Sequence, residues 1–137
     1  MWNATRKMAE AIADGMHAAD PSAAIKLFNT SKTDKTDVIT DVFRSKAVIL
    51  GSSTMANGYL YSIAGILDLM RGMKFKNKKA AAFGSYGWSG EAVANLTERL
   101  KQLRMKVSEG FRIRFCPSEQ ELLKAKKFAE DFAENLK

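Results

Sequence analysis

The order of apolar segments along the chain predicts an α/β fold with a doubly wound, parallel, three-layer sheet. Residues 47–51 and 80–84 are short apolar runs that each end in glycine, which is typical of strands buried on both faces. Stretches with apolar residues at helical spacing separate them, and strands that alternate with helices indicate a parallel sheet. Residues 107–115 alternate apolar and charged side chains instead, and this period of two suits a strand near the sheet edge.

The first third of the chain predicts two helices and one further strand. Residues 5–19 carry apolar side chains at helical spacing, and Asp20-Pro21 ends that helix. Residues 24–28 predict a short strand before a turn-rich segment. Residues 34–44 predict a second helix, whose inward side chains are Val38, Ile39, Val42 and Phe43.

The remainder of the chain repeats the pattern of strand, polar loop and helix. Residues 59–70 predict a third helix, and a fourth follows the loop at 85–90. Pro117-Ser118 leads into the last helix. The fourth helix carries its apolar face on Val93, Leu96, Leu100 and Leu103, and the last on Leu122, Ala125, Phe128 or Ala129, Phe132 and Leu136.

One central strand is missing from this order of elements. A doubly wound sheet usually begins with a buried central strand, whereas this chain begins with a helix, and two buried strands need a third beside them. We expect one of three solutions. Residues upstream of Met1 exist in the native gene product, another segment fills the gap, or residues 24–28 pair directly with residues 47–51.

Length and composition narrow the class of protein. The 137 residues suit one domain, 46% apolar content argues against disorder, and no apolar run reaches the length of a membrane helix. The single cysteine, Cys116, cannot form an internal disulfide, so a cytoplasmic setting is expected. The single histidine, His17, excludes a histidine-rich metal centre within this chain. The net charge of +7 has its main concentration at Arg71, Lys74, Lys76, Lys78 and Lys79.

Three polar segments are expected to meet at the carboxyl edge of the sheet. They are residues 1–5, 52–58 and 85–90, and all are rich in serine, threonine, glycine, asparagine and aromatic residues. Ligands of open α/β sheets bind at this edge. Residues 1–5 open a helix, whose free N–H groups can hold a phosphate, and residues 85–90 combine aromatic with small side chains. The sequence therefore predicts a site for a phosphorylated planar cofactor.

The segment Phe83-Gly-Ser-Tyr-Gly-Trp-Ser-Gly-Glu-Ala92 resembles the flavin loop of flavodiiron proteins, the A-type flavoproteins that include flavorubredoxins. Gly51-Ser-Ser-Thr-Met-Ala-Asn-Gly58 resembles their preceding flavin loop, and Met1-Trp-Asn-Ala-Thr5 resembles the end of their phosphate loop. The resemblance covers essentially the whole chain in order. It implies the C-terminal flavodoxin-like domain of that family, with FMN as its cofactor.

The resemblance also implies a role for each candidate residue. The FMN phosphate would be bound by Thr5 together with the backbone of Trp2, Asn3 and Ala4. One side of the isoalloxazine ring would be lined by Ser53, Thr54, Met55 and Asn57, with Gly58 closing that loop. The other side would be lined by Ser85, Tyr86, Gly87 and Trp88, with Ser89 and Gly90 shaping the loop. No residue is assigned a catalytic or metal-binding role, so the chain holds no complete catalytic centre of an oxidoreductase.

Departures from the family pattern indicate a fragment of a longer protein. The strand and the threonine-bearing segment that precede Met1-Trp2 in the family are absent, Ser53 replaces a proline, and the diiron domain is missing. By resemblance, the whole of residues 1–137 would be one FMN-binding domain. It would relay electrons from a rubredoxin-like donor or a reductase to a diiron domain that reduces oxygen or nitric oxide, commonly across a homodimer.

Several plainer interpretations stay open beside this one. Thr5 could be an ordinary helix cap, Tyr86 and Trp88 could be core residues, and Asn57-Gly58 a simple turn. Ser89 lacks the Gly-x-Ser-x-Gly elbow of serine hydrolases. The basic run precedes the strand at 80–84, so it lies at the amino edge of the sheet and is not expected to contact the cofactor phosphate. It could be an ordinary solvated loop or a docking site for an acidic redox partner. Nucleic acid is not expected to bind there. The alternative function is a non-redox basic scaffold or a polyanion-binding module.

Overall fold

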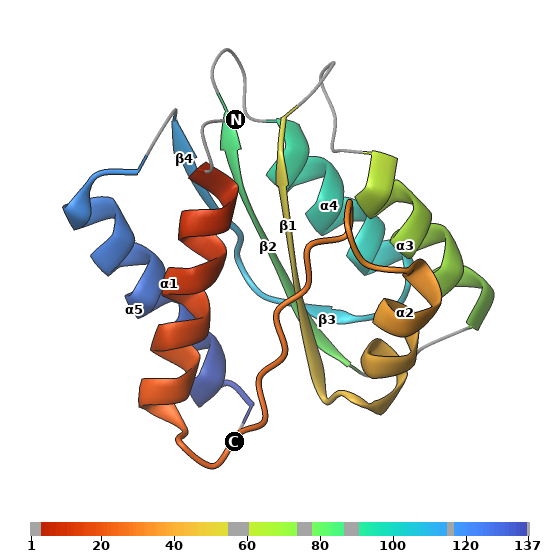
Figure 1. The fold of residues 1–137 in the computed structure, drawn as a ribbon, viewed down its shortest axis with the longest axis horizontal. Coiled ribbons are helices and arrows are strands. Elements are labelled where there is room, and N and C mark those ends of the chain that lie inside the picture. Colours follow the sequence, from red (N-terminus) through yellow and green to blue (C-terminus); the bar gives the residue numbers. More distant parts are fainter. Residues whose placement is uncertain (1–3, 55–60, 74–77, 87–90, 115–116, 137) are drawn as a thin grey trace.

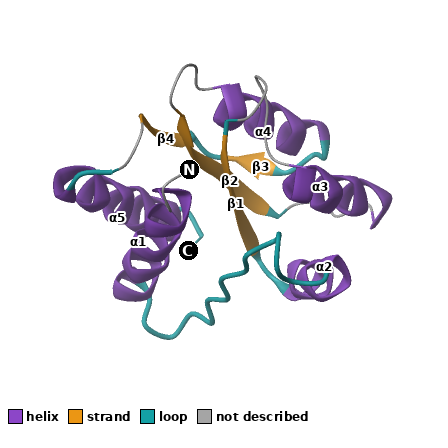
Figure 2. Cartoon of the chain, turned by 45° about the horizontal axis from the view of Figure 1, so that its top comes forward, coloured by secondary structure: helices purple, strands orange, loops and turns teal. Residues whose placement is uncertain are grey.

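The computed structural model describes residues 4–54, 61–73, 78–86, 91–114 and 117–136. Figure 1 shows a parallel sheet between two layers of helices. Helices α1 (Ala4–Ala19) and α5 (Glu119–Glu134) cover one face. The opposite face carries α2, α3 and α4, as Figure 2 shows from a second direction. The predicted three-layer α/β class is therefore confirmed. The three remaining helices are α2 (Lys35–Arg44), α3 (Tyr61–Met73) and α4 (Glu91–Gln102).

The sheet is built around β2 (Lys79–Tyr86), which is buried except at its first and last residues and pairs with each of the other described strands. On one side β1 (Ala47–Ser53) runs parallel to it, with Ala47 opposite Lys79 and Ser53 opposite Ser85. On the other side β3 (Lys106–Val107) pairs with the start of β2 and β4 (Phe111–Arg114) with its end. Because all pairs are parallel, the carboxyl ends of β1, β2 and β4 lie at the same edge of the sheet.

The helices begin where the sequence supplies caps. The side chain of Asp34 accepts a hydrogen bond from the backbone N–H of Thr36 and so caps α2. Ser118 and Glu121 form a reciprocal capping box at the start of α5. None of the helices formed by the described residues is long and apolar enough to cross a membrane.

Two hydrophobic clusters hold the three layers together. The first joins α2, α3 and α4 to the sheet and includes Ile66, Met70, Leu96 and Leu100, all of which are fully or almost fully buried. The second joins α1 and α5 to the other face and includes Met8, Ile12 and Phe83. The apolar faces predicted for the first, fourth and last helices are therefore confirmed, except that Leu103 and Leu136 lie just beyond the ends of α4 and α5 and are partly buried.

Gly15 allows α1 and α5 to approach each other closely. A Cβ atom at this position would lie 2.5 Å from the backbone oxygen of Lys126 and 2.9 Å from Cβ of Ala129. We expect Gly15→Ala to lower the free energy of unfolding by about 1–3 kcal/mol, because overpacking against backbone outweighs the better helix propensity of alanine.

Gly72, in α3, supplies the matched control for this prediction. It is exposed, and nothing lies within 4 Å of a Cβ added there. Gly72→Ala should raise the free energy of unfolding by about 0.5–1 kcal/mol, because only helix propensity changes. Urea denaturation of both variants measures the two effects. If both substitutions changed the free energy of unfolding equally and in the same direction, the close approach of α1 and α5 would be contradicted.

The strand predicted at residues 24–28 does not form. The segment between Ala23 and Asn29 has no ladder partner, and in the described sheet β1 pairs only with β2. The direct pairing of residues 24–28 with β1 is therefore not adopted. A strand exists only where its N–H and C=O groups pair with a neighbour, and residues 24–28 make no such pairs with the open edge of β1.

Three smaller expectations also change. The pattern of residues 47–51 predicts burial on both faces. Val48 and Leu50 are buried, whereas Ile49 is only partly buried against the second cluster, because β1 is an edge strand of the described sheet. Phe43 is expected to face inward, but it is 61% exposed. The predicted strand at 107–115 is interrupted between β3 and β4, although Ile113 is buried and Arg112 and Arg114 are exposed, as the alternation predicts.

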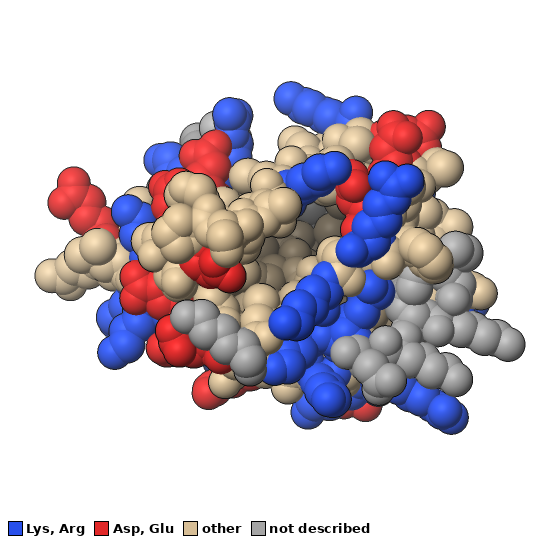
Figure 3. Space-filling model, turned by 90° about the horizontal axis from the view of Figure 1, so that it is seen from below, with Lys and Arg blue, Asp and Glu red and all other residues tan. Residues whose placement is uncertain are grey.

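The amino edge of the sheet carries lysines at the starts of its strands. Lys46 precedes β1 and donates to the backbone oxygen of Leu136 at 2.7 Å, and Lys78 precedes β2 and donates to the backbone oxygens of Phe43 and Ser45. Seen from below, the molecule is hollowed near its middle, and lysine and arginine side chains gather around the hollow (Figure 3). The described part of the basic run therefore lies at the edge opposite the candidate site.

Candidate functional site

A hydroxyl pair joins the first helix to the carboxyl end of the central strand. The side-chain oxygens of Thr5 and Ser85 lie 2.9 Å apart, although 80 positions separate them in the sequence. Thr5 is in the first turn of α1, whose leading N–H groups have no partner within the helix. Ser85 is only 1% exposed. Hydroxyl donors and helix N–H groups are thereby placed together at the carboxyl edge, which is a suitable donor set for an anion.

Thr54 connects the ends of β1 and β2 with the start of α4. Its backbone N–H donates to the carbonyl oxygen of Ser85 at 2.9 Å, and its hydroxyl oxygen accepts from the backbone N–H of Ala92 at 3.3 Å. This threonine follows β1 directly, while Ala92 lies in the first turn of α4. The three segments that the sequence predicts to converge are therefore tied together by their described residues.

Small side chains keep this edge of the sheet compact. Ser52 is fully buried, and its hydroxyl donates to the backbone oxygen of Ser53 at 2.8 Å. Gly84 lies so close to Ser52 that an added Cβ atom would overlap the carbonyl oxygen of Ser52. The strands can pack this tightly only without a side chain at position 84, and their ends then hold the hydroxyl groups in fixed positions.

Tyr86, the last residue of β2, is accompanied by a cation that the sequence did not assign to the site. The guanidinium carbon of Arg112 lies 5.4 Å from the centroid of the Tyr86 ring, which is within cation–π range. Arg112 is on β4, opposite Gly84 in the strand register. The alternation in residues 107–115 correctly placed Arg112 on the outer face, but no sequence signal paired it with Tyr86.

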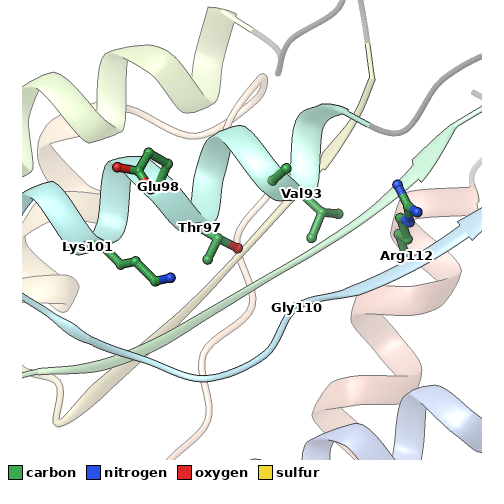
Figure 4. A pocket seen from close by; sticks show the side chains of 7 residues that line it. Val93, Thr97, Glu98, Lys101, Gly110 and Arg112 are labelled. Carbon is green, nitrogen blue, oxygen red and sulfur yellow. The ribbon is translucent and has the colours of Figure 1, made fainter.

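Arg112 also borders an open hollow of about 450 Å³ between α4 and β4 (Figure 4). Thr97, Glu98 and Lys101 come to its wall from α4, and Gly110 comes from the segment before β4. The hollow has one carboxylate and two cationic side chains. It adjoins Tyr86 through Arg112 but contains none of the residues predicted to bind the cofactor.

Glu91 places a carboxylate oxygen in a buried position beside the predicted flavin loop. Its Oε2 atom is buried and has no hydrogen-bond partner among the described residues. The residue lies in the first turn of α4, where the helix dipole favours a negative charge. This oxygen can accept a hydrogen bond from a donor that the described residues do not supply.

Six of the fifteen predicted cofactor-binding residues lie in the described part of the chain, and the structure brings them to one edge of the sheet. They are Ala4, Thr5, Ser53, Thr54, Ser85 and Tyr86. The other nine lie outside the described residues: Trp2, Asn3, Met55, Asn57, Gly58, Gly87, Trp88, Ser89 and Gly90. The structure thus describes the two strand ends and the helix start that would carry the loops.

Comparisons with known proteins agree with this architecture. A family model described as Flavodoxin matches residues 1–135. The chain is 48% identical over 120 residues to the anaerobic nitric oxide reductase flavorubredoxin of Aliivibrio fischeri, a match covering 88% of this chain and 24% of that protein. The chain spans about a quarter of the length of the curated relatives it matches.

Solved structures give the same result at the level of the fold. The rubredoxin oxygen:oxidoreductase of Desulfovibrio gigas superposes with a TM-score of 0.93 at 30% identity, over 99% of this chain and 34% of that one. A flavodoxin from the domain Archaea superposes with a TM-score of 0.88 at 28% identity, over 99% of this chain and 92% of that flavodoxin. The chain therefore has the fold of a flavodoxin and of one domain of a larger oxidoreductase.

Proposed function

Since the chain belongs to the flavodoxin family and corresponds to the flavodoxin-like domain of flavodiiron proteins, we propose that it binds FMN at the carboxyl edge of its sheet and transfers electrons through it. FMN is the cofactor of this family. The flavin accepts and releases the electrons, and the protein holds it, orients it and limits the access of water.

The observation that carries this proposal is the meeting of Thr5, Ser85 and Thr54 at one edge of the sheet. A phosphate needs hydrogen-bond donors, and the hydroxyls of Thr5 and Ser85 lie beside the N–H groups at the start of α1. The buried polar residues at the ends of β1 and β2 are the small side chains Ser52, Ser53 and Ser85. The described residues therefore fit a phosphorylated cofactor.

We assign three groups of residues to the cofactor. The phosphate would be held by Thr5 and by the backbone of Trp2, Asn3 and Ala4, while two loops would enclose the ring. The first loop comprises Ser53, Thr54, Met55, Asn57 and Gly58, and the second comprises Ser85, Tyr86, Gly87, Trp88, Ser89 and Gly90. The hydrogen bonds of Thr54 to Ser85 at the end of β2 and to Ala92 at the start of α4 would keep the two loops at a constant separation.

The relatives support a proposal for the wider assembly. We propose that residues 1–137 form one FMN-binding domain of a longer polypeptide, which receives electrons from a rubredoxin-like donor or a reductase and passes them to a diiron domain that reduces oxygen or nitric oxide. The flavorubredoxin and the rubredoxin oxygen:oxidoreductase named above are several times longer than this chain. A homodimer would bring the flavin of one copy to the diiron domain of the other, and a cytoplasmic setting suits this function.

The outer edge of β1 supports the presence of a further strand. In the described sheet β1 has a partner on one side only. Because α1 starts at the carboxyl edge, a strand entering it would run parallel to β1 and β2. The gene sequence upstream of the Met1 codon tests this proposal, and an in-frame stop codon close to Met1 would contradict it.

Titration of the purified chain with FMN tests the central proposal. We expect the fluorescence of FMN to be quenched on binding at a ratio of one flavin per chain, and the visible absorption bands of the flavin to shift. Circular dichroism of the same sample checks that the chain is folded. A folded chain that neither retains nor rebinds FMN would contradict the proposal and favour the non-redox scaffold.

A further inference from the structure

The outer strand of the sheet places a guanidinium group beside the end of the central strand. Arg112 of β4 lies opposite Gly84 of β2, and its guanidinium carbon is 5.4 Å from the centre of the Tyr86 ring. Both side chains project to the α4 side of the sheet: Arg112 borders the hollow lined by α4, and Tyr86 is two positions beyond Gly84, which faces Val93. The pair is thus a defined feature of this face.

The position of Arg112 is set by the fold rather than by chance contact. Gly110 packs against Val93 and the backbone of Ala82, so the chain can return to the central strand at that point and form β4. The register of β4 then places residue 112 on the outer face. The Tyr86 ring is half-buried and provides the surface on which the exposed guanidinium rests.

We propose that Arg112, held against Tyr86, makes the flavin easier to reduce by placing a fixed positive charge beside the second flavin loop. The inference rests on the proposed function, because Tyr86 is assigned to that loop. Reduction of a flavin by two electrons and one proton leaves the ring one unit more negative. A nearby cation stabilises the more negative form more than the oxidised form, so it raises the reduction potential.

The solvent exposure of Arg112 limits how far its charge can shift the reduction potential of the flavin. Arg112 is accessible to solvent, so water and salt screen its charge, and the interaction is that of a partly screened pair. We expect Arg112→Gln to weaken the binding of reduced FMN relative to oxidised FMN by about threefold to tenfold at low salt. The difference should shrink as the ionic strength rises from about 20 mM to 500 mM.

The test is a reductive titration with dithionite and a reference dye, combined with the affinity of each variant for oxidised FMN. Lys106→Gln is the matched control: it removes one positive charge from an exposed position on the same flank of β2, but at the amino edge and on the opposite face of the sheet, in register with Lys79. We expect the ratio of the affinity for reduced FMN to the affinity for oxidised FMN to change less than twofold in Lys106→Gln. In Arg112→Lys the same ratio should remain close to that of the wild type.

A second comparison tests whether Tyr86 holds the charge in place. In the Tyr86→Leu background the effect of Arg112→Gln should be smaller than in the wild type, because the guanidinium no longer has a ring to rest on. If the wild-type chain binds no FMN, the proposed function and this inference both fail. If it binds FMN but Arg112→Gln and Lys106→Gln shift the potential equally, only the role of Arg112 is contradicted.

Discussion

Gly84→Ala is expected to lower the free energy of unfolding by about 3 kcal/mol, because the added methyl group would meet backbone rather than a flexible side chain. Gly84 lies in the buried central strand, and the Cβ atom of alanine would overlap the carbonyl oxygen of Ser52 and approach Cγ2 of Val93 to 3.2 Å. The obstacle is backbone of β1, which cannot move without breaking the pairing of the two strands. Such a loss is a large part of the roughly 5–15 kcal/mol that stabilises a typical domain.

The same substitution is expected to weaken FMN binding, because it displaces the neighbouring hydroxyl. Ser85 follows Gly84 directly, and a shift of a few tenths of an ångström between β1 and β2 would disturb both the contact of Ser85 with Thr5 and the bond from Thr54. Urea denaturation gives the stability, and FMN titration at a temperature where the variant is folded gives the affinity. Unchanged values of both would contradict the close packing of the strand ends.

Gly51 provides the contrast that separates backbone from side-chain obstruction. A Cβ atom there would overlap the ring of Phe83, which lies opposite it in the register. Adding Phe83→Leu should therefore recover part of the stability lost in Gly51→Ala. Adding Val93→Ala to Gly84→Ala should recover none, since the carbonyl oxygen of Ser52 remains in place.

The elements that the sequence predicted correctly are those whose signals are local. The apolar stripes of α1, α4 and α5 follow the helical period, and Asp34 and Ser118 mark helix starts by bonds to residues two or three positions away. These interactions need no partner from a distant part of the chain. Residues 24–28 fail for the opposite reason: a strand forms only by pairing with a distant segment, and the local pattern of residues 24–28 does not determine that pairing.

The candidate site also combines features that the sequence predicts with features that depend on contacts between distant segments. That the ends of β1 and β2 lie together follows from parallel pairing, so Thr54 and Ser85 could be placed at one edge from the sequence. The partner of Tyr86 could not be identified from the sequence. Arg112 reaches it because the chain breaks between β3 and β4 and re-enters the sheet in one particular register, which depends on the packing of Gly110 against α4.

Thr5→Val is expected to weaken FMN binding by about tenfold to a hundredfold. The substitution keeps the shape of the side chain but removes the hydroxyl that lies 2.9 Å from the Ser85 hydroxyl at the start of α1. A hydrogen bond to a charged group contributes about 1.5–3 kcal/mol, which corresponds to that range of affinity. The measurement is a fluorescence titration of wild type and variant with FMN.

Riboflavin separates a phosphate ligand from an ordinary structural residue at position 5. Riboflavin has the same ring but no phosphate, so Thr5→Val should leave its affinity nearly unchanged if the hydroxyl acts on the phosphate. Thr40→Val is the matched control, because the Thr40 hydroxyl bonds to the backbone of Thr36 within α2, on the other side of the sheet. An equal loss for both flavins would mean that Thr5 stabilises the edge of the sheet through Ser85 and does not bind the phosphate.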